Sequence, residues 1–231
     1  MFDYFGSKKR LAPTYDPPTY DTIIEPFAGA AAYSMLWLTR RREMTAILYD
    51  IDPMVIELWT RLLDLTPEEL WHYPDPVKGE RTTDPIYLTA TVTYGSWVRA
   101  SKGKDYQISE WMHRDFPEIK RRMADTLAHV RGRVTIHDAS YEGAPDIEAT
   151  WFIDPPYQTE GHQYALGNAI DFAGLGDWCR SRQGQVIVCE SLGADWLEFT
   201  PHRMTKTVAN ASSTEVVWYS HPEPTLLDLI S

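Results

Sequence analysis

The sequence predicts an α/β fold in which helices cover both faces of a largely parallel sheet. Short apolar runs typical of buried strands alternate along the chain with segments rich in helix-forming residues. Several of these runs end at an acidic residue, a proline or a small-residue turn, as expected where the strands of such a sheet meet their loops. The 231 residues, 43% of them hydrophobic, suffice for one or two globular domains.

The first part of the chain, residues 1–72, is predicted to hold an irregular arm and the first half of the core. Expected strands span 22–24 and 46–49, and expected helices span 30–41, 53–63 and a short stretch from 66. Asp52 before Pro53 is a typical helix start. Thr66 and Glu69 have the spacing of a capping box, which predicts the start of the short helix.

Residues 73–118 show no rhythm of strands and helices and are predicted to form an inserted lobe that divides the core. Apolar side chains at helical spacing predict a helix over 117–131 that ends at Gly132, and the lobe's boundary could include this helix. From 78 to 133 there are 11 Lys and Arg against 7 Asp and Glu, whereas the whole chain has a net charge of −11. A basic lobe between acidic flanks is a candidate nucleic-acid surface, although the overall charge argues against such a partner.

The alternation of strands and helices resumes in residues 119–231, which form the second half of the core. A helix is expected over 171–182. Expected strands span 134–136, 150–153, 185–189 and 214–219, the last one paired with 207–211.

Composition limits the classes of protein to consider. Cys179 and Cys189 cannot form a disulfide framework and lack the spacing of a zinc site, and the seven histidines are scattered, so we expect no metal. The N-terminus has no apolar signal region, and the longest apolar stretch, 23–38, is interrupted by Glu25 and Pro26, so no membrane span is expected. These features predict a cytoplasmic protein, in the host cell's cytoplasm if the chain is phage-encoded.

The most informative motif directly follows the expected strand 150–153 and consists of Asp154, Pro155, Pro156 and Tyr157. Two successive prolines hold the backbone extended and remove two N–H donors. A carboxylate and prolyl carbonyls therefore remain as acceptors beside an aromatic ring. Such a corner suits an amino group on a planar ring, and a rigid turn with an exposed tyrosine is the plainer alternative.

A second motif, residues 25–31, joins the first expected strand to the first helix. Its small side chains allow the backbone to approach a ligand closely, as in dinucleotide-binding turns. Because Gly29 is its single glycine, a nucleoside without a pyrophosphate fits better than a dinucleotide, and a tightly packed turn is the alternative. Asp50 ends the second strand, at the position where an acid would bind the two hydroxyls of a ribose. An aspartate at a strand end is more often a helix cap, but Asp52 can cap the next helix, which leaves Asp50 available.

The order FDYFGSK, IEPFAGAA, YDID and IDPPY resembles the alpha-class, or Dam-like, DNA adenine N6-methyltransferases. The resemblance covers about residues 2–65 and 134–220. It implies a Rossmann-like methyltransferase sheet with helices on both faces, a small inserted target-recognition lobe and S-adenosylmethionine as cofactor. The chain departs from the family by carrying Ala30 and Ala31 where a second glycine is usual, and it is short for the class.

The resemblance also implies which residues contact the cofactor. Tyr4 and Lys8, in the arm, would contact S-adenosylmethionine. Asp50 would hold its ribose hydroxyls, the adjacent Ile51 would also contact the cofactor, and Asp138 would reach its adenine. The turn residues that would shape the pocket are Glu25, Phe27, Ala28 and Gly29.

For catalysis, the resemblance implies that the Asp154 carboxylate and the Pro155 carbonyl accept hydrogen bonds from the two hydrogens of the target amino group. Asp154 would also contact the cofactor. Two such bonds favour a pyramidal nitrogen whose lone pair can attack the sulfonium methyl in line. Tyr157 would stack on a base that has been flipped out of the duplex.

Double-stranded DNA is the expected partner, and the basic lobe is the candidate contact. The side chains expected to reach it are Trp97, Arg99, Lys102, Lys104, Lys120, Arg121 and Arg122, although a solvated helix face would also explain 120–122. Whether a restriction partner exists is not encoded in any motif. Two alternatives stay open: the same chemistry on cytosine N4, RNA or a protein amide, and a non-catalytic binding module.

Overall fold

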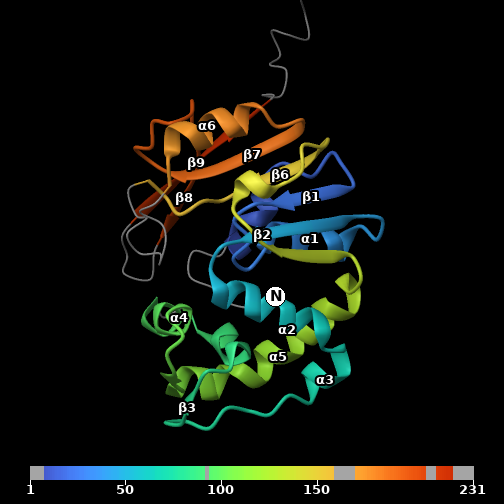
Figure 1. The fold of residues 1–231 in the computed structure, drawn as a ribbon, viewed down its shortest axis with the longest axis vertical. Helices are drawn as coiled ribbons and strands as arrows, with labels where there is room; N and C mark the ends of the chain where they lie inside the picture. The colour runs from blue at the N-terminus through green and yellow to red at the C-terminus, as the bar shows by residue number, and fades with distance from the viewer. Residues whose placement is uncertain (1–7, 92–93, 159–169, 207–211, 221–231) are drawn as a thin grey trace, which may run out of the picture.

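The structure is a computed structural model that describes residues 8–91, 94–158, 170–206 and 212–220 (Figure 1). Its main feature is a seven-stranded sheet in the order β5-β2-β1-β6-β7-β9-β8. The strands are β1 Thr22–Glu25, β2 Thr45–Asp50, β5 Val134–Asp138, β6 Ala149–Ile153, β7 Gly184–Ser191, β8 Thr200–Lys206 and β9 Ser212–Tyr219. The helices are α1 Ala32–Arg40, α2 Pro53–Asp64, α3 Pro67–Trp71, α4 Tyr94–Ser101, α5 Glu110–Val130 and α6 Phe172–Arg180.

Five strands of this sheet are parallel, and the order of the strands reverses at β1. The chain runs outward from β1 through β2 to β5 and then returns to place β6 on the other side of β1. β7 extends the parallel part, and β9 lies antiparallel between β7 and β8. This arrangement confirms the predicted Rossmann-like α/β sheet, whose ligands bind outside the carboxyl ends of strands at such a reversal.

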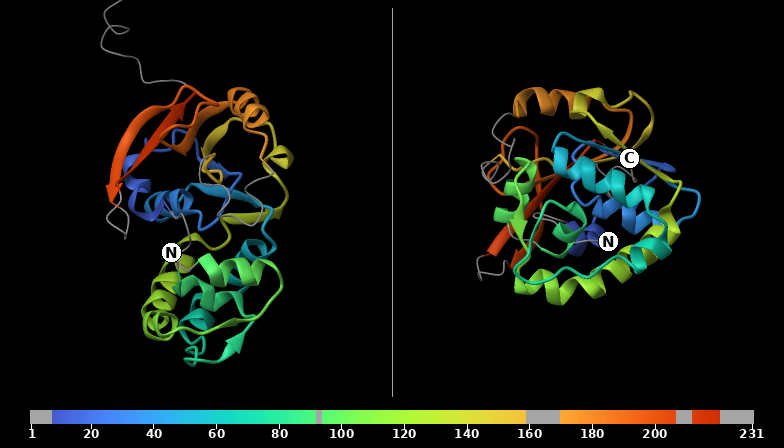
Figure 2. Two further views of the ribbon diagram at one scale, coloured as in Figure 1. Left: turned by 90° about the vertical axis from the view of Figure 1, so that its left-hand side faces the viewer. Right: turned by 60° about the horizontal axis from the view of Figure 1, so that its bottom comes forward.

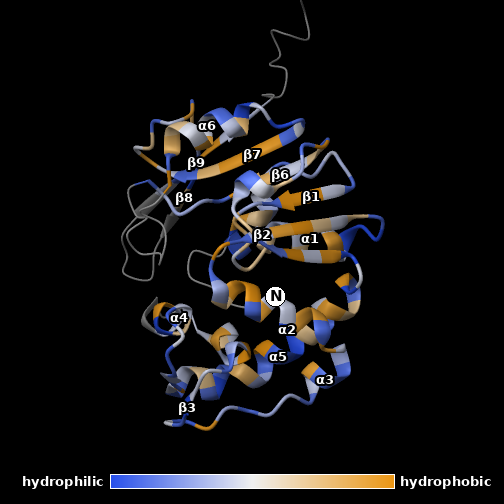
Figure 3. Ribbon diagram, viewed as in Figure 1, coloured by the Kyte–Doolittle hydropathy of each residue, from blue (hydrophilic) through white to orange (hydrophobic). Residues whose placement is uncertain are grey.

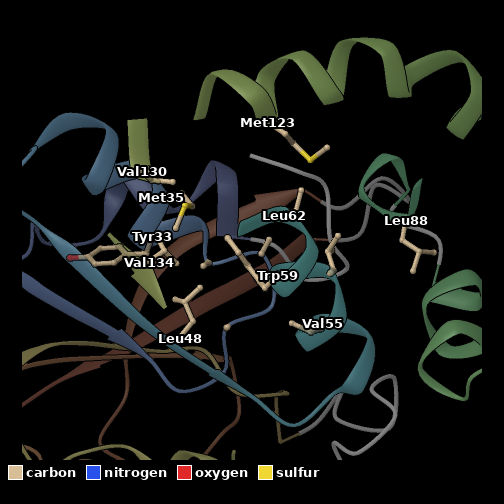
Figure 4. Close-up of a cluster of buried hydrophobic side chains, with 14 of the residues drawn as sticks. Tyr33, Met35, Leu48, Val55, Trp59, Leu62, Leu88, Met123, Val130 and Val134 are labelled. Carbon is tan, nitrogen blue, oxygen red and sulfur yellow. The ribbon is translucent and has the colours of Figure 1, made fainter. Parts of the chain in front are cut away.

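Helices cover both faces of the sheet because buried side chains alternate along the strands. Leu48 and Phe152 face one cluster, which also holds residues of α1, α2 and α5, while Trp151 and Ile153 face a second cluster that includes Leu175 of α6. Figure 3 shows the orange, apolar stretches along β1 and β7, where both faces are covered. Figure 4 shows side chains of the first cluster from several elements packed together.

The inserted segment contains a two-stranded antiparallel ribbon and shares the core of the sheet domain. The ribbon pairs β3 Arg81–Thr82 with β4 Tyr106–Gln107 and is joined to α4 by a 3-10 helix over Pro85–Ala90. In Figures 1 and 2 this green segment gathers at one end of the molecule. Its buried Leu88 and Tyr106 belong to the same apolar cluster as Leu48. The lobe boundaries drawn from the sequence, 73 and 118, therefore remain predictions within a continuous core.

Most expected elements are present, with boundaries shifted by local backbone requirements. The N-cap Asp52 accepts a hydrogen bond from the Met54 N–H at 2.9 Å, and the capping box at α3 is formed as predicted. The helix expected from residue 30 begins at Ala32 because Ala31 has a left-handed φ of 44°. A left-handed residue cannot continue a right-handed helix.

Two expectations from the sequence are wrong. α5 begins at Glu110 rather than at residue 117, because Ser109 caps it by accepting from the Met112 N–H, and Pro117 lies inside the helix. The partner of β9 is β8, which precedes the expected segment 207–211; that segment lies outside the described residues. Pro201 makes β8 difficult to predict from the sequence, because proline is accepted in strands mainly at edges and at irregularities such as the one between Pro201 and Arg203. No helix in the described ranges is long and apolar enough to span a bilayer.

Candidate active site at the carboxyl edge of the sheet

Every parallel strand of the sheet ends at or next to an acidic residue. Because these strands run in the same direction, their carboxyl ends lie along one edge. The acids are Glu25 of β1, Asp50 of β2, Asp138 of β5, Asp154 directly after β6 and Glu190 of β7. β1 and β6 are neighbours at the reversal of strand order, so the small-residue turn and the 154–157 tetrad follow adjacent strands.

The turn after β1 is compact and largely buried. Ala28 donates its N–H to the Tyr49 carbonyl at 2.9 Å, and the Trp59 indole donates to the Gly29 carbonyl at 2.8 Å. Gly29 and Ala31 both have positive φ, 45° and 44°. Ala31 is not a glycine, so the left-handed conformation is adopted here by a residue with a Cβ atom, which glycine would favour more.

The Asp50 carboxylate is bound to the turn by backbone donors. Its Oδ2 accepts from the Gly29 N–H at 3.0 Å and its Oδ1 from the Asp52 N–H at 2.9 Å. Burial raises the pKa of Asp50 to about 6, against the lowering effect of these backbone hydrogen bonds. Since Asp52 caps α2, Asp50 is not needed as the cap of that helix, and its contact with a ribose stays a prediction. Ile51, next to it, has 44% of its surface exposed.

The remaining predicted cofactor residues surround this turn to different degrees. Glu25 is buried and accepts from the Ser34 N–H at 2.7 Å, and burial raises its pKa to about 8. The Phe27 ring stacks on Tyr141 with a centroid distance of 5.7 Å. Asp138 is exposed and is the register partner of Asp50 on β5. Tyr4 lies outside the described residues.

Asp154 forms a buried ion pair that the sequence did not predict. The Lys8 Nζ lies 2.6 Å from Asp154 Oδ1 and 3.7 Å from Glu215 Oε1, and the Lys8 side chain is 8% exposed. Burial raises the pKa of Asp154 to about 6, whereas the Lys8 ammonium lowers it. Burial by itself lowers the pKa of Lys8. The two carboxylates together raise that pKa by a larger amount, so the net shift is upward and the amine is protonated.

Tyr157 is held at both its ring and its hydroxyl. The Lys8 ammonium lies over the ring at 4.7 Å from the centroid. The Tyr157 hydroxyl donates to Glu215 Oε1 at 2.7 Å, and the Tyr15 hydroxyl donates to the same oxygen at 2.8 Å. Burial raises the pKa of Tyr157 well above its usual range. Both phenols are therefore hydrogen-bond donors to one carboxylate.

Glu190 secures the chain just after the tetrad. It is fully buried, and its Oε2 accepts from the Gln158 N–H at 2.9 Å and from the Trp196 indole at 3.1 Å. Its Oε1 accepts from the Ser191 N–H at 2.7 Å. Its burial within β7 places Glu190 inside the protein rather than on a surface loop.

Two of the predicted DNA contacts are structural residues. Trp97 is 4% exposed, and its indole donates to the Thr91 carbonyl at 3.0 Å within the core of the lobe. Lys120 is buried, with its Nζ 2.7 Å from the Tyr73 carbonyl and 2.6 Å from Asp75 Oδ1. The predicted DNA contacts through these two side chains are therefore wrong for this conformation, because burial removes both from the surface.

The other basic side chains of the lobe are accessible to different extents. Arg99 is exposed and bonds to Asp105, whose carbonyl accepts from its Nε at 3.1 Å. Lys102 and Lys104 are exposed, and in the part of the chain that the structure describes neither forms an ion pair. They are the lobe's most available cations.

On α5, the neighbouring predicted contacts Arg121 and Arg122 differ in their exposure and in their partners. Arg121 is exposed and lies over the Trp71 ring at 5.9 Å. Arg122 is half-buried and lies 4.0 Å from Glu118 one helical turn earlier. Arg121 stays a predicted DNA contact, whereas Arg122 is turned along its own helix.

Tyr15 and Glu215 are the site residues that sequence reasoning missed. Glu215 sits within the apolar run at 214–219, and a lone acid in such a run is a signal of a buried, partnered carboxylate. Tyr15 carried no such signal, because the arm around it is rich in Pro and Tyr and has no periodicity. Only the folded chain brings the two together.

No protein-family model matches the sequence, and no curated protein matches it. Among solved structures, the chain aligns with one described as "Putative methyltransferase yhhF from Escherichia coli". The alignment covers 91% of this chain and 80% of that one, with 12% identity and a TM-score of 0.37. A likeness this weak carries no conclusion about function.

Proposed function

We propose that the protein is an S-adenosylmethionine-dependent methyltransferase that methylates the exocyclic N6 amine of adenine in double-stranded DNA. The observation that carries the proposal is the position of the 154–157 tetrad. It directly follows β6, next to the turn after β1, at the reversal of strand order where such sheets bind ligands. An acceptor-rich corner and a nucleoside-binding turn are thus side by side.

The residues around the turn suit a nucleoside cofactor. The Asp50 carboxylate uses one lone pair of each oxygen on backbone donors, which leaves acceptor capacity for ribose hydroxyls. The small buried side chains Ala28 and Ala31 leave the backbone of the turn as its main surface. When bound, S-adenosylmethionine supplies an activated sulfonium methyl group, and the chain's own contribution is to position the acceptor.

Asp154 and Pro155 supply that positioning. Adenine's exocyclic amine is a weak nucleophile because its lone pair is delocalised into the ring. Hydrogen bonds from its two hydrogens to the Asp154 carboxylate and the Pro155 carbonyl favour a pyramidal nitrogen with an available lone pair. The Asp154 carboxylate is also the nearest base for the proton that the methylated nitrogen loses, and its pKa of about 6 keeps it mainly ionised at neutral pH.

The lobe and Tyr157 supply the remaining parts. A base inside a duplex is out of reach, so the target must be flipped, and the Tyr157 ring offers a stacking surface for it. The exposed cations Lys102, Lys104 and Arg121 would contact phosphates.

A second candidate keeps the cofactor but changes the acceptor to cytosine N4, RNA or a protein amide. The specific observation in its favour is the loss of cationic surface in the lobe, where Lys120 is buried against Asp75 and Arg81 bonds to Asp105 through two nitrogens. Together with the net charge of −11, this leaves fewer contacts for the phosphates of a nucleic acid than the sequence suggested, so among these acceptors it favours the protein amide.

The test is methyl transfer from labelled S-adenosylmethionine to unmethylated genomic DNA, followed by nucleoside mass spectrometry. We expect N6-methyladenine with the wild type and none with Asp154→Ala, in which cofactor binding should persist with reduced affinity. Asp177→Ala is the matched control, because this aspartate is 85% exposed on α6. Label in RNA or protein instead of DNA would favour the second candidate, and no transfer to any acceptor would refute both.

A further inference from the structure

Three side chains from two separate segments of the chain, the arm and the tetrad, meet at one oxygen of Glu215. The Tyr15 hydroxyl from the arm, the Tyr157 hydroxyl from the tetrad and the Lys8 ammonium lie 2.8, 2.7 and 3.7 Å from its Oε1. Glu215 itself lies on β9 and is 6% exposed. We propose that Glu215 is a positioning residue that orients the Tyr157 ring for the acceptor base, a role that rests on the proposed function.

The ring of Tyr157 needs an external anchor because it follows two prolines at the end of a strand. Its hydroxyl bond to Glu215 fixes the far end of the side chain. The Lys8 ammonium, 4.7 Å from the ring centroid, occupies one side of the ring. These two contacts define both the direction and the tilt of the ring, and stacking on a flipped base depends on both.

Orientation explains the geometry of Glu215 better than charge balance with Lys8. The shortest ion pair of Lys8 is with Asp154, at 2.6 Å, whereas Glu215 lies 3.7 Å away. The closest partners of Glu215 are instead the two phenol hydroxyls. A buried carboxylate is stabilised by such donors, and in return it holds them in place.

The two tyrosines provide an internal comparison, because both donate to the same oxygen but only Tyr157 belongs to the tetrad. Tyr157→Phe removes the hydroxyl that would orient the ring. Tyr15→Phe removes a hydroxyl of the same kind and leaves the Tyr157 contact in place. Glu215→Ala removes the shared acceptor, and Glu215→Gln keeps an acceptor oxygen without the charge.

The experiment measures steady-state methyl transfer to whichever acceptor the wild type modifies, with cofactor affinity determined separately by calorimetry. We expect Tyr157→Phe and Glu215→Ala each to raise KM for the acceptor at least tenfold, with kcat changed less than threefold and cofactor Kd unchanged. The double variant that combines Tyr157→Phe with Glu215→Ala should raise the acceptor KM no more than either single variant does. Glu215→Gln should recover most of the acceptor KM, and Tyr15→Phe should change that KM far less than Tyr157→Phe does. Asp177→Ala, at an exposed residue of α6, should resemble the wild type.

Additive losses in the double variant, or equal effects of Tyr15→Phe and Tyr157→Phe, would overturn the positioning role. A Gln variant as impaired as the Ala variant would do the same, because charge rather than orientation would then matter. Circular dichroism and thermal melts check folding, and if Glu215→Ala does not fold, the comparison of the two tyrosine variants decides. A wild type that methylates no acceptor refutes the proposed function, whereas an active wild type with additive losses refutes only this inference.

Discussion

The ammonium of Lys8 lies 2.6 Å from Oδ1 of Asp154, so the N-terminal segment contributes a charge directly to the end of β6. Both side chains are largely buried, at 8% and 19% exposure. The ammonium opposes the effect of burial on Asp154, whose pKa would otherwise lie higher than about 6. The pair thereby keeps an acceptor carboxylate ionised near neutral pH in a poorly hydrated place.

The pH dependence of methyl transfer should follow this pair. The pKa of Asp154 is raised from its usual value to about 6, so the carboxyl group is mostly ionised above that pH and mostly protonated below it. We expect kcat/KM to fall about tenfold per pH unit on the acid side of about pH 6. Lys8→Met removes the cation that lowers this pKa and should move the acid limb to higher pH. Lys9→Met, a change at an exposed neighbouring residue, is the control, and an unmoved limb in Lys8→Met would contradict the coupling.

Asp50→Asn should weaken cofactor binding more than it slows the chemical step. An asparagine nitrogen would face one of the backbone donors Gly29 or Asp52, so one hydrogen bond of the turn is lost. We expect cofactor Kd to rise about tenfold or more, equivalent to about 1.4 kcal/mol, from calorimetric titration. Asp52→Asn is the matched control because asparagine is a good N-cap, and its Kd should stay near that of the wild type. An unchanged Kd in Asp50→Asn would remove Asp50 from the site.

Within the lobe, exposed and buried lysines should behave differently. Lys102→Ala combined with Lys104→Ala should weaken DNA binding and reduce the slope of log K against log salt by about 2, without changing Tm. Lys120→Ala should leave that slope unchanged and destabilise the fold by about 1–3 kcal/mol, because the Tyr73 carbonyl loses its donor. Fluorescence anisotropy over a salt series and thermal unfolding separate the two effects. A salt slope altered only by Lys120→Ala would reverse the assignment.

The conformation of Ala31 predicts a stabilising substitution. An alanine with a φ of 44° carries a steric penalty of about 1–2 kcal/mol that glycine lacks. Ala31→Gly should therefore raise the free energy of unfolding by up to about 1 kcal/mol, after the loss of a small buried methyl group. The neighbouring buried Ala30, which has no positive φ, is the control, and Ala30→Gly should destabilise the protein. Chemical denaturation measures both, and equal losses in the two variants would contradict the strain at Ala31.

Much of the sheet could be predicted because its information is local. Apolar runs of strand length and the N-caps Asp52 and Thr66 depend on neighbouring residues, and the structure reproduces them. The start of α5 was mispredicted because Pro117 resembles a first-turn proline, while the true cap, Ser109, lies in a segment without clear periodicity. β8 was missed because proline is accepted mainly in edge strands and at irregularities, and the position of β8 at the edge of the sheet is decided only by the tertiary structure.

The sequence by itself determined the order of the elements, the small-residue turn, and the acids at the ends of the strands, because each arises from contacts close along the chain. Only the tertiary structure decided which distant groups share a site: Lys8 with Asp154, and Tyr15 with Tyr157 on Glu215. It also decided that Trp97 and Lys120 are buried although their sequence neighbourhoods are those of surface residues. The physical reason is that burial and charge pairing depend on how strands and helices pack across the sheet, which the pattern along one segment does not contain.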